Sequence, residues 1–256
     1  VTGVQTCALP ICALHTAYGF VIFVILFFIF FPLLLIPIVF KRQHQLIGVF
    51  NRWWAITLLT LIAMPWHREI HSKIDKTKRY IFCPNHFSYL DIVAMGLNPF
   101  NAIFVGKNSM EKIPLFGFMY RKLHITVDRS KLTSKYGSYT RSLEALDEGK
   151  SLVIFPEGGI VSTEPPKMSR FKDGAFRLAI EKQIPIVPVT LPDNWIILPD
   201  NSMVLRPRPI RLIFHEPVDP TGYTVKDIDT LKMKVFGIIE QELKKLNHED
   251  QPRVTG

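Results

Sequence analysis

Residues 85–91 read Asn-His-Phe-Ser-Tyr-Leu-Asp, between an apolar run at 80–83 and a helix-like stretch at 92–95. This order predicts that His86 lies at a strand-to-helix turn and that Asp91 lies about one helical turn further on. A carboxylate on one imidazole nitrogen fixes the tautomer and leaves the other nitrogen free to accept a proton. The spacing therefore predicts a catalytic pair in which Asp91 orients His86. Because no serine or cysteine stands beside it in a nucleophile elbow, this base would act on a hydroxyl of the substrate.

Apolar strand-like runs alternate with helix-like segments beyond about residue 73. We predict strands at 80–83, 102–105, 124–127, 152–155, 186–191 and 210–214. We predict helices at 89–97, 115–122, 131–148, 174–182 and 225–246. Such alternation is typical of an α/β domain with a mostly parallel sheet flanked by helices. We predict that this domain covers residues 73–256.

The N-terminal part has the composition of a membrane anchor. Residues 17–40 carry no charged side chain, and this run exceeds the about 20 apolar residues that a spanning helix needs. A signal peptide would have a shorter apolar region followed by small residues, so the run predicts a membrane helix. Lys41 and Arg42 follow it, which predicts a catalytic domain on the cytoplasmic face of a bacterial inner membrane.

A second apolar stretch, at 46–66, has tryptophans at both ends. This favours a helix that lies in the membrane surface, while a second span and a re-entrant hairpin stay open. Residues 67–71 are interpreted as a polar exit from that surface. The segment 12–72 is thus predicted to hold a membrane helix and an interfacial helix. Residues 1–11 match the translation of a common sequencing adapter, and we exclude them from the fold as a suspected artefact.

The chain is basic, with 31 Lys and Arg against 22 Asp and Glu among its 256 residues. This excess suits anionic lipids or phosphorylated substrates. Nucleic acid is not an expected partner, because no dense Lys/Arg tract with interleaved aromatic residues is present. The apolar fraction of 48% is enough for both a core and a membrane segment.

Together with Phe-Pro-Glu-Gly at 155–158, the Asn-His-x4-Asp motif resembles the 1-acylglycerol-3-phosphate acyltransferase family of membrane glycerolipid acyltransferases. The similarity runs from about residue 80 to residue 191 and holds four blocks in the family's order. It implies acyl transfer from a thioester to the free hydroxyl of lysophosphatidic acid, giving phosphatidic acid, with His86 and Asp91 as the catalytic residues. It also implies an acyl-carrier protein or acyl-coenzyme A as donor, membrane lipids and a lysophospholipid as partners, and neither metal nor cofactor.

The second block ends in Val-Asp-Arg at 127–129. The resemblance implies that Arg129 binds the acceptor's phosphate, and a guanidinium fork suits a phosphate monoester. A surface salt bridge to Asp128 or a helix-capping role is the alternative for this arginine. Lys107, earlier in the same block, is a second candidate for substrate binding.

The third block reads Phe-Pro-Glu-Gly-Gly-Ile at 155–160. In the family, the residues that match Glu157 and Gly158 hold the acceptor or shape its pocket. The commoner continuation is Thr-Arg-Ser, so this chain lacks one expected phosphate-binding cation. We expect Arg170 or Lys172 to substitute for it.

Other interpretations stay open. The fourth block, at 184–190, either lines the acyl or acceptor pocket or is a plain core strand. A lipid hydrolase would need a serine beside the pair, but Gly-x-Ser-x-Gly is absent and Ser88 is too close in sequence. A non-catalytic membrane adaptor would bind membranes without turnover. The altered third block also leaves room for another lysophospholipid or an amino-acid lipid as acceptor.

Overall fold

One seven-stranded sheet organises residues 9–128 and 130–249, the part of the chain that the computed structural model describes. The strand order is β1 (Trp66–Ile70), β7 (Ile210–Phe214), β6 (Ile186–Thr190), β2 (Ile81–Pro84), β5 (Ser151–Ile154), β3 (Ala102–Lys107) and β4 (Ile125–Val127). Neighbouring strands are parallel except β6 and β7, which are antiparallel. The predicted mostly parallel α/β fold is confirmed, and each predicted strand lies within two residues of an observed one.

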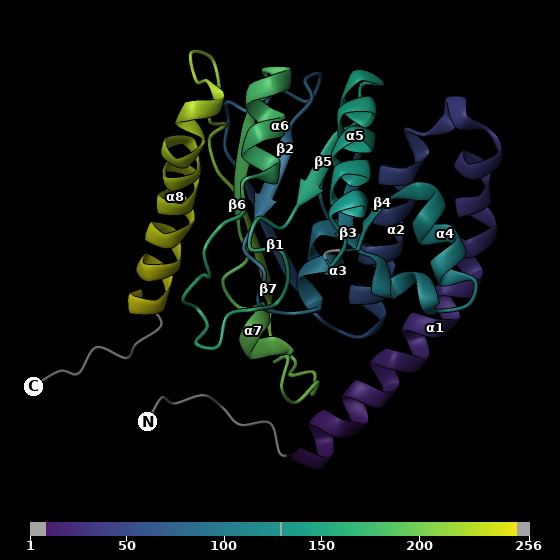
Figure 1. Ribbon diagram of the computed structural model, residues 1–256. Helices are drawn as coiled ribbons and strands as arrows, with labels where there is room; N and C mark the ends of the chain where they lie inside the picture. Colours follow the sequence, from purple (N-terminus) through teal and green to yellow (C-terminus); the bar gives the residue numbers. More distant parts are fainter. Residues whose placement is uncertain (1–8, 129, 250–256) are drawn as a thin grey trace, which may run out of the picture.

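Helices cover both faces of the sheet (Figure 1). One face packs against α5 (Leu132–Asp147), α6 (Gly174–Lys182) and α8 (Ile228–Glu249), and the other against α2 (Leu46–Leu61) and α3 (Leu90–Gly96). The described chain also holds α4 (Phe116–Leu123), α7 (Asn194–Ile197) and three short 3₁₀ helices, η1 (Lys41–Gln43), η2 (Asn108–Lys112) and η3 (Val225–Asp227).

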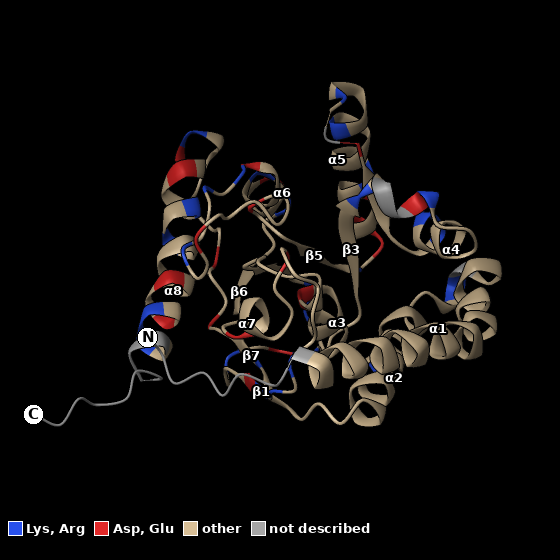
Figure 2. Ribbon diagram, turned by 90° about the horizontal axis from the view of Figure 1, so that it is seen from below, with Lys and Arg blue, Asp and Glu red and all other residues tan. Residues whose placement is uncertain are grey.

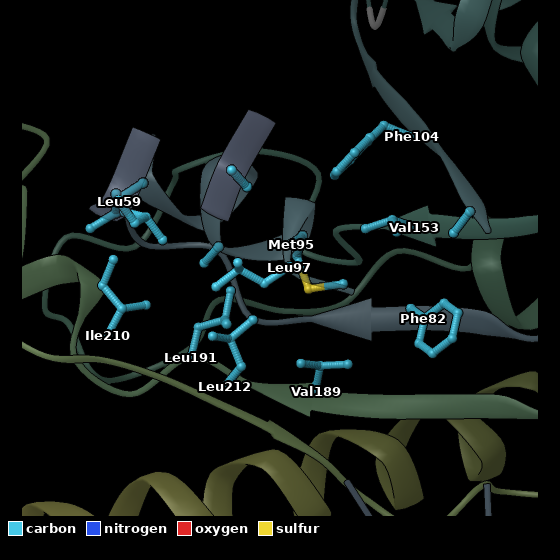
Figure 3. Packing of buried hydrophobic residues seen from close by; sticks show 14 of the residues in the cluster. Leu59, Phe82, Met95, Leu97, Phe104, Val153, Val189, Leu191, Ile210 and Leu212 are labelled. Atoms are coloured by element: carbon cyan, nitrogen blue, oxygen red, sulfur yellow. The ribbon is translucent and has the colours of Figure 1, made fainter. Parts of the chain in front are cut away.

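The central strand β2 contributes to both cores because successive side chains of a strand point to opposite faces. Ile81 and Cys83 belong to the core under α5, α6 and α8, whereas Phe82 belongs to the core under α2 and α3. Figure 3 shows Phe82 in this second core, beside strand residues Val153 and Val189. A strand buried on both faces reads as a continuous apolar run, which explains why β2 was predictable.

The N-terminal helix α1 (Leu9–Val39) is long and apolar enough to cross a membrane, and it continues through Pro32 and Pro37. It includes residues 9–11 of the segment suspected to be an artefact, while residues 1–8 lie outside the described chain. Figure 2 shows α1 without Lys, Arg, Asp or Glu along its length.

Helix α2 packs against α1 as the second arm of a hairpin. The Tyr18 hydroxyl donates to the Leu61 carbonyl at 3.0 Å, so the start of α1 lies beside the end of α2. Phe23 and Trp54 meet edge to face with ring centroids 5.1 Å apart. The predicted helix at 46–66 is therefore present but ends at Leu61.

The strand β1 corrects the interpretation of residues 67–71 as a polar exit from the membrane surface. Trp66–Ile70 pairs in parallel with β7 along its whole length and forms one edge of the sheet. The sheet therefore begins before the domain boundary predicted at residue 73. The side chains of β1 alternate between half-buried and exposed, as the edge position of the strand allows.

Candidate active site

Three neighbouring parallel strands end at the site. β6, β2 and β5 lie side by side, so their carboxyl ends meet at one edge of the sheet. Asn85 and His86 follow β2, Glu157 follows β5, and Leu191 follows β6. The Asn85 side chain joins two of these ends, because it donates to the Leu191 carbonyl and accepts from the Leu191 N–H. The carboxyl edge of an open α/β sheet is where ligands usually bind.

His86 and Asp91 meet as the sequence spacing predicts. The His86 Nδ1 and Asp91 Oδ2 atoms are 3.0 Å apart, and Asp91 lies in the first turn of α3. Because a carboxylate accepts, the proton sits on Nδ1 and Nε2 is left as the acceptor. His86 is 8% exposed and stacks on Phe155 with ring centroids 4.0 Å apart, so its ring is held in place on one face.

The carboxylate of Asp91 is fully buried and held by donors on both oxygens. Oδ2 also accepts from the backbone N–H groups of Phe87 and Ser88, at 2.7 and 2.8 Å. Oδ1 accepts from the Nδ2 of Asn194 at 2.8 Å. Sequence reasoning missed Asn194, which is fully buried in α7 and far from the motif in the chain. It fixes the plane of the carboxylate that orients His86.

Glu157 connects the motif turn to a second loop. Its Oε1 accepts from the His86 N–H and its Oε2 from the Ser169 N–H, both at 2.8 Å. Burial, helped by the nearby charge of Asp91, raises the pKa of Glu157 to about 7 against the lowering effect of these two hydrogen bonds. Since backbone donors occupy both oxygens, the geometry gives Glu157 a positioning role, and contact with substrate stays a prediction.

The other predicted site residues either lie at the same edge of the sheet or fall outside the described residues. Gly158 directly follows Glu157 and has a φ of +82°, which favours glycine. Lys107 is exposed at the carboxyl end of β3, and Arg170 is exposed one residue after Ser169. Arg129 lies outside the described residues, so its predicted role in phosphate binding stays a prediction.

An apolar cavity of about 570 Å³ lies beside the motif turn. Tyr89 and Leu90, which separate His86 from Asp91 in sequence, form part of its wall. Leu198 is also in the wall, and its carbonyl accepts from the Ser88 hydroxyl at 2.6 Å. Apolar side chains of α1, α2, α3 and α4 supply most of the rest, including Phe23, Phe27, Trp54, Leu58, Val93 and Met119. The cavity therefore lies between the N-terminal hairpin and the turn that carries His86.

Comparisons with known proteins point to one family. Residues 67–192 match the family model described as Acyltransferase. The chain is 26% identical to the 1-acyl-sn-glycerol-3-phosphate acyltransferase of Haemophilus influenzae over 258 residues, which cover 96% of this chain and 94% of that relative. It is 29% identical to the enzyme of the same description from Limnanthes alba over 178 residues, 68% of this chain and 63% of the relative. It thus spans somewhat less than two thirds of the plant protein.

A solved structure shares the fold. The crystal structure of the 1-acyl-sn-glycerophosphate (LPA) acyltransferase PlsC from Thermotoga maritima matches with a TM-score of 0.75. The match covers 92% of this chain and 98% of that chain at 20% sequence identity.

Proposed function

This chain belongs to the 1-acylglycerol-3-phosphate acyltransferase family, and we propose that it transfers an acyl group from a thioester to the free hydroxyl of lysophosphatidic acid. The product is phosphatidic acid. The observation that carries this proposal is the buried His86–Asp91 pair, with its 3.0 Å contact, next to an apolar cavity. This reaction requires, among other things, a base for the acceptor's hydroxyl and an apolar site for the acyl chain.

The reaction proceeds through His86. Its Nε2 takes the proton of the lysolipid hydroxyl while the oxygen attacks the thioester carbonyl carbon. Asp91 stabilises the resulting imidazolium through Nδ1–H. The carbon–sulfur bond then breaks, and the imidazolium returns the proton to the leaving thiolate. General base catalysis of this kind contributes about 10²–10⁴-fold in rate.

The surroundings of Ser88 favour a transferase over a serine hydrolase. Its hydroxyl donates to the Leu198 carbonyl and accepts from the Leu90 N–H, and Ser88 is fully buried. A serine nucleophile would instead donate to the catalytic histidine. The nucleophile therefore comes from the acceptor. An adaptor would not need a buried carboxylate with four donors around it, so a non-catalytic role has less support.

The cavity suits a membrane acyl chain. Its wall includes α1 residues from Thr16 to Leu34, a stretch of about 27 Å at the rise of an α-helix. One leaflet of a bilayer core is about 15 Å thick, so the cavity is long enough for such a chain. The donor is acyl-coenzyme A or an acyl-carrier protein, both of which carry the chain as a thioester. The net charge of +9 suits an acidic carrier.

Membrane association completes the proposal. Helix α1 anchors the protein, and Arg42 after it keeps the catalytic domain on the cytoplasmic face of a bacterial inner membrane. Another lysophospholipid or an amino-acid lipid is the second candidate acceptor. The observation that favours it is Ile160, which stands where the family commonly has an arginine.

The test replaces the base and leaves the fold alone. His86→Ala, in membranes supplied with lysophosphatidic acid and an acyl thioester, should lower phosphatidic acid formation by at least about 10²-fold. His67→Ala is the matched control, because its side chain is 68% exposed and lies on β1. Asp91→Asn should lose a comparable factor through the wrong tautomer. Near-normal product formation by His86→Ala, read by mass spectrometry, would remove His86 from the mechanism.

A further inference from the structure

Two polar side chains stand in the wall of the apolar cavity. Asn51 on α2 and His124 between α4 and β4 both line it, among side chains that are mostly aliphatic or aromatic. Neither residue belongs to the catalytic pair or to the hydrogen bonds that hold it. A polar group in an apolar cavity is costly unless a partner satisfies it, so these two side chains point to a ligand with a polar group of its own.

One ring nitrogen of His124 is used by the fold and the other is not. The Phe104 N–H donates to Nδ1 at 3.3 Å, so Nδ1 is the acceptor and the ring proton is on Nε2. Burial lowers the pKa of His124 to about 4, so the ring is neutral at physiological pH. Within residues 9–128 and 130–249, Nε2 has no hydrogen-bond partner. It is therefore a neutral donor in the wall of the cavity.

Asn51 offers a donor and an acceptor in the same part of the cavity. Its side-chain amide also has no hydrogen-bond partner in the part of the chain that the structure describes. Asn51 and Phe104 together line a smaller hollow of about 10 Å³ beside the cavity. Phe104 in turn meets the His124 ring edge to face, with ring centroids 5.4 Å apart. Because Phe104 is next to both polar side chains, the two belong to one region of the wall.

This region lies away from the base. Helix α3 begins beside the turn of His86, and its residues between Leu90 and Gly96 contribute to the wall. A Cβ added to Gly96 would lie 3.5 Å from the backbone oxygen of Asn51, so Asn51 is beside the far end of α3. The rise of an α-helix places that end about 9 Å from its first residue. A polar group at this depth meets an acyl chain several carbons beyond its carbonyl.

We propose that the Nε2–H of His124 and the amide of Asn51 bind a hydroxyl group on the acyl chain that occupies the cavity. This inference rests on the proposed function and names the class of lipid that the enzyme selects, a chain hydroxylated several carbons from its carbonyl. A hydroxyl both accepts and donates, and an imidazole N–H with an amide oxygen matches it. An unsubstituted chain leaves both polar side chains unsatisfied, so the cavity discriminates against it.

Kinetics with matched acyl chains test the assignment. Wild type and His124→Asn are given acyl-coenzyme A donors of one length, either unsubstituted or with a single hydroxyl at successive carbons. Asparagine keeps an acceptor near Nδ1 for the Phe104 N–H but has no donor at the position of Nε2. At the hydroxyl position that wild type uses best, the ratio of kcat/KM for the hydroxylated over the unsubstituted donor should fall about 5- to 10-fold in His124→Asn. Asn51→Leu should lower the same ratio.

A control and a second arm make the result specific. His67→Asn makes the same exchange at a 68% exposed side chain of β1 and should leave the ratio unchanged. The second arm places the hydroxyl on the chain of the lysophosphatidic acid, with an unsubstituted donor, and shows which lipid occupies the cavity. A ratio that His124→Asn leaves unchanged in both arms would overturn the assignment. An equal loss with hydroxylated and unsubstituted chains would also overturn it, because the role of His124 would then be structural.

Binding without turnover separates this inference from the proposed function. Displacement of a fluorescent fatty acid by hexadecanoate and by hydroxyhexadecanoate is measured for His86→Ala and for His86→Ala/His124→Asn in the same micelles. Partition into detergent is common to both proteins, and the ratio of the two affinities should fall about 5- to 10-fold in the double variant. If it falls while wild type makes no phosphatidic acid, the proposed function fails and the cavity still selects a hydroxylated chain. An unchanged ratio would overturn the role of His124 alone.

Discussion

At the scale of single residues, the site is built around two buried carboxyl groups, those of Asp91 and Glu157, whose oxygens accept hydrogen bonds from surrounding donors. Asp91 accepts from two backbone N–H groups, from His86 and from Asn194. A buried carboxylate keeps its charge only when such donors replace water. Because these contacts fix the orientation of the Asp91 carboxylate, the carboxylate also fixes the His86 ring. A base with a fixed acceptor nitrogen requires such a fixed ring.

Glu157 makes the stability of this site depend on pH. Its pKa is about 7 in the folded chain against an ordinary value of 4.5, chiefly because burial disfavours the charged form. A folded-state pKa above the unfolded value adds stability that is complete below pH 4.5 and is lost as pH rises through 7. A shift of this size corresponds to roughly 3 kcal/mol.

The prediction concerns Glu157→Gln, which does not titrate. Between pH 4.5 and 8, the melting temperature of wild type should fall relative to that of the variant, because only wild type has to ionise a buried carboxyl. Thermal unfolding of both proteins in the same detergent across this range measures the difference. A difference that stays constant over the range would show that Glu157 is ionised throughout and that burial is offset by its hydrogen bonds.

Spacing could predict some of these residues and not others. His86 and Asp91 are neighbours in sequence, so a turn and the pitch of a helix are enough to bring them together. Asn194 contacts Asp91 from more than a hundred residues away, and no periodicity marks it. The two backbone contacts of Glu157 depend on how two loops pack, which the residue type does not reveal.

At the scale of elements, burial on both faces made the central strands predictable. β2 and β6 are continuously buried, and both were expected from their apolar runs. β1 reads Trp-His-Arg-Glu-Ile, and its exposed positions carry His67 and Glu69. Such a short edge strand has the composition of a loop, and only its pairing with β7 makes it a strand.

Helix α2 is held to the sheet by close backbone contact at Gly48. Its N–H, in the first turn of α2, donates to the Asn101 side chain at 3.1 Å, and an added Cβ would lie 2.8 Å from Asn101 Cα. Gly48→Ala should therefore destabilise the protein by about 1–3 kcal/mol, because backbone must move to admit the methyl group. A lower melting temperature by several degrees is the expected measurement.

Gly237 is the matched control for Gly48. It lies within α8, and a Cβ there would meet no atom within 4 Å. Gly237→Ala should stabilise the chain by about 0.5–1 kcal/mol through the higher helix propensity of alanine. If the two substitutions shifted the melting temperature in the same direction, close packing of α2 would not be what distinguishes these sites.

At the scale of the whole molecule, the cavity lies between the hairpin of α1 and α2 and the turn that carries His86. One wall comes from α1 and α2, and the other from α3, α4 and the loop after α7. The outer face of α1 is apolar and exposed, with Val21, Phe28 and Ile29 each more than half exposed. An exposed apolar face of this length needs a membrane to cover it. Under the proposed function, an acyl chain would enter this cavity from the lipid phase.

The outer face of α1 should therefore decide membrane binding without affecting chemistry. Replacing Phe28 and Ile29 by Asp places two charges in the apolar segment, each costing about 3 kcal/mol in a bilayer. The double variant should float far less with phosphatidylethanolamine/phosphatidylglycerol vesicles than wild type does. Neither residue lines the cavity, so turnover in detergent micelles should survive. Met233→Asp, which adds a charge at an exposed position of α8, should float like wild type. Equal flotation of the double variant and wild type would mean that another surface of the protein binds the membrane. An acyl chain would then have to enter the cavity at another point.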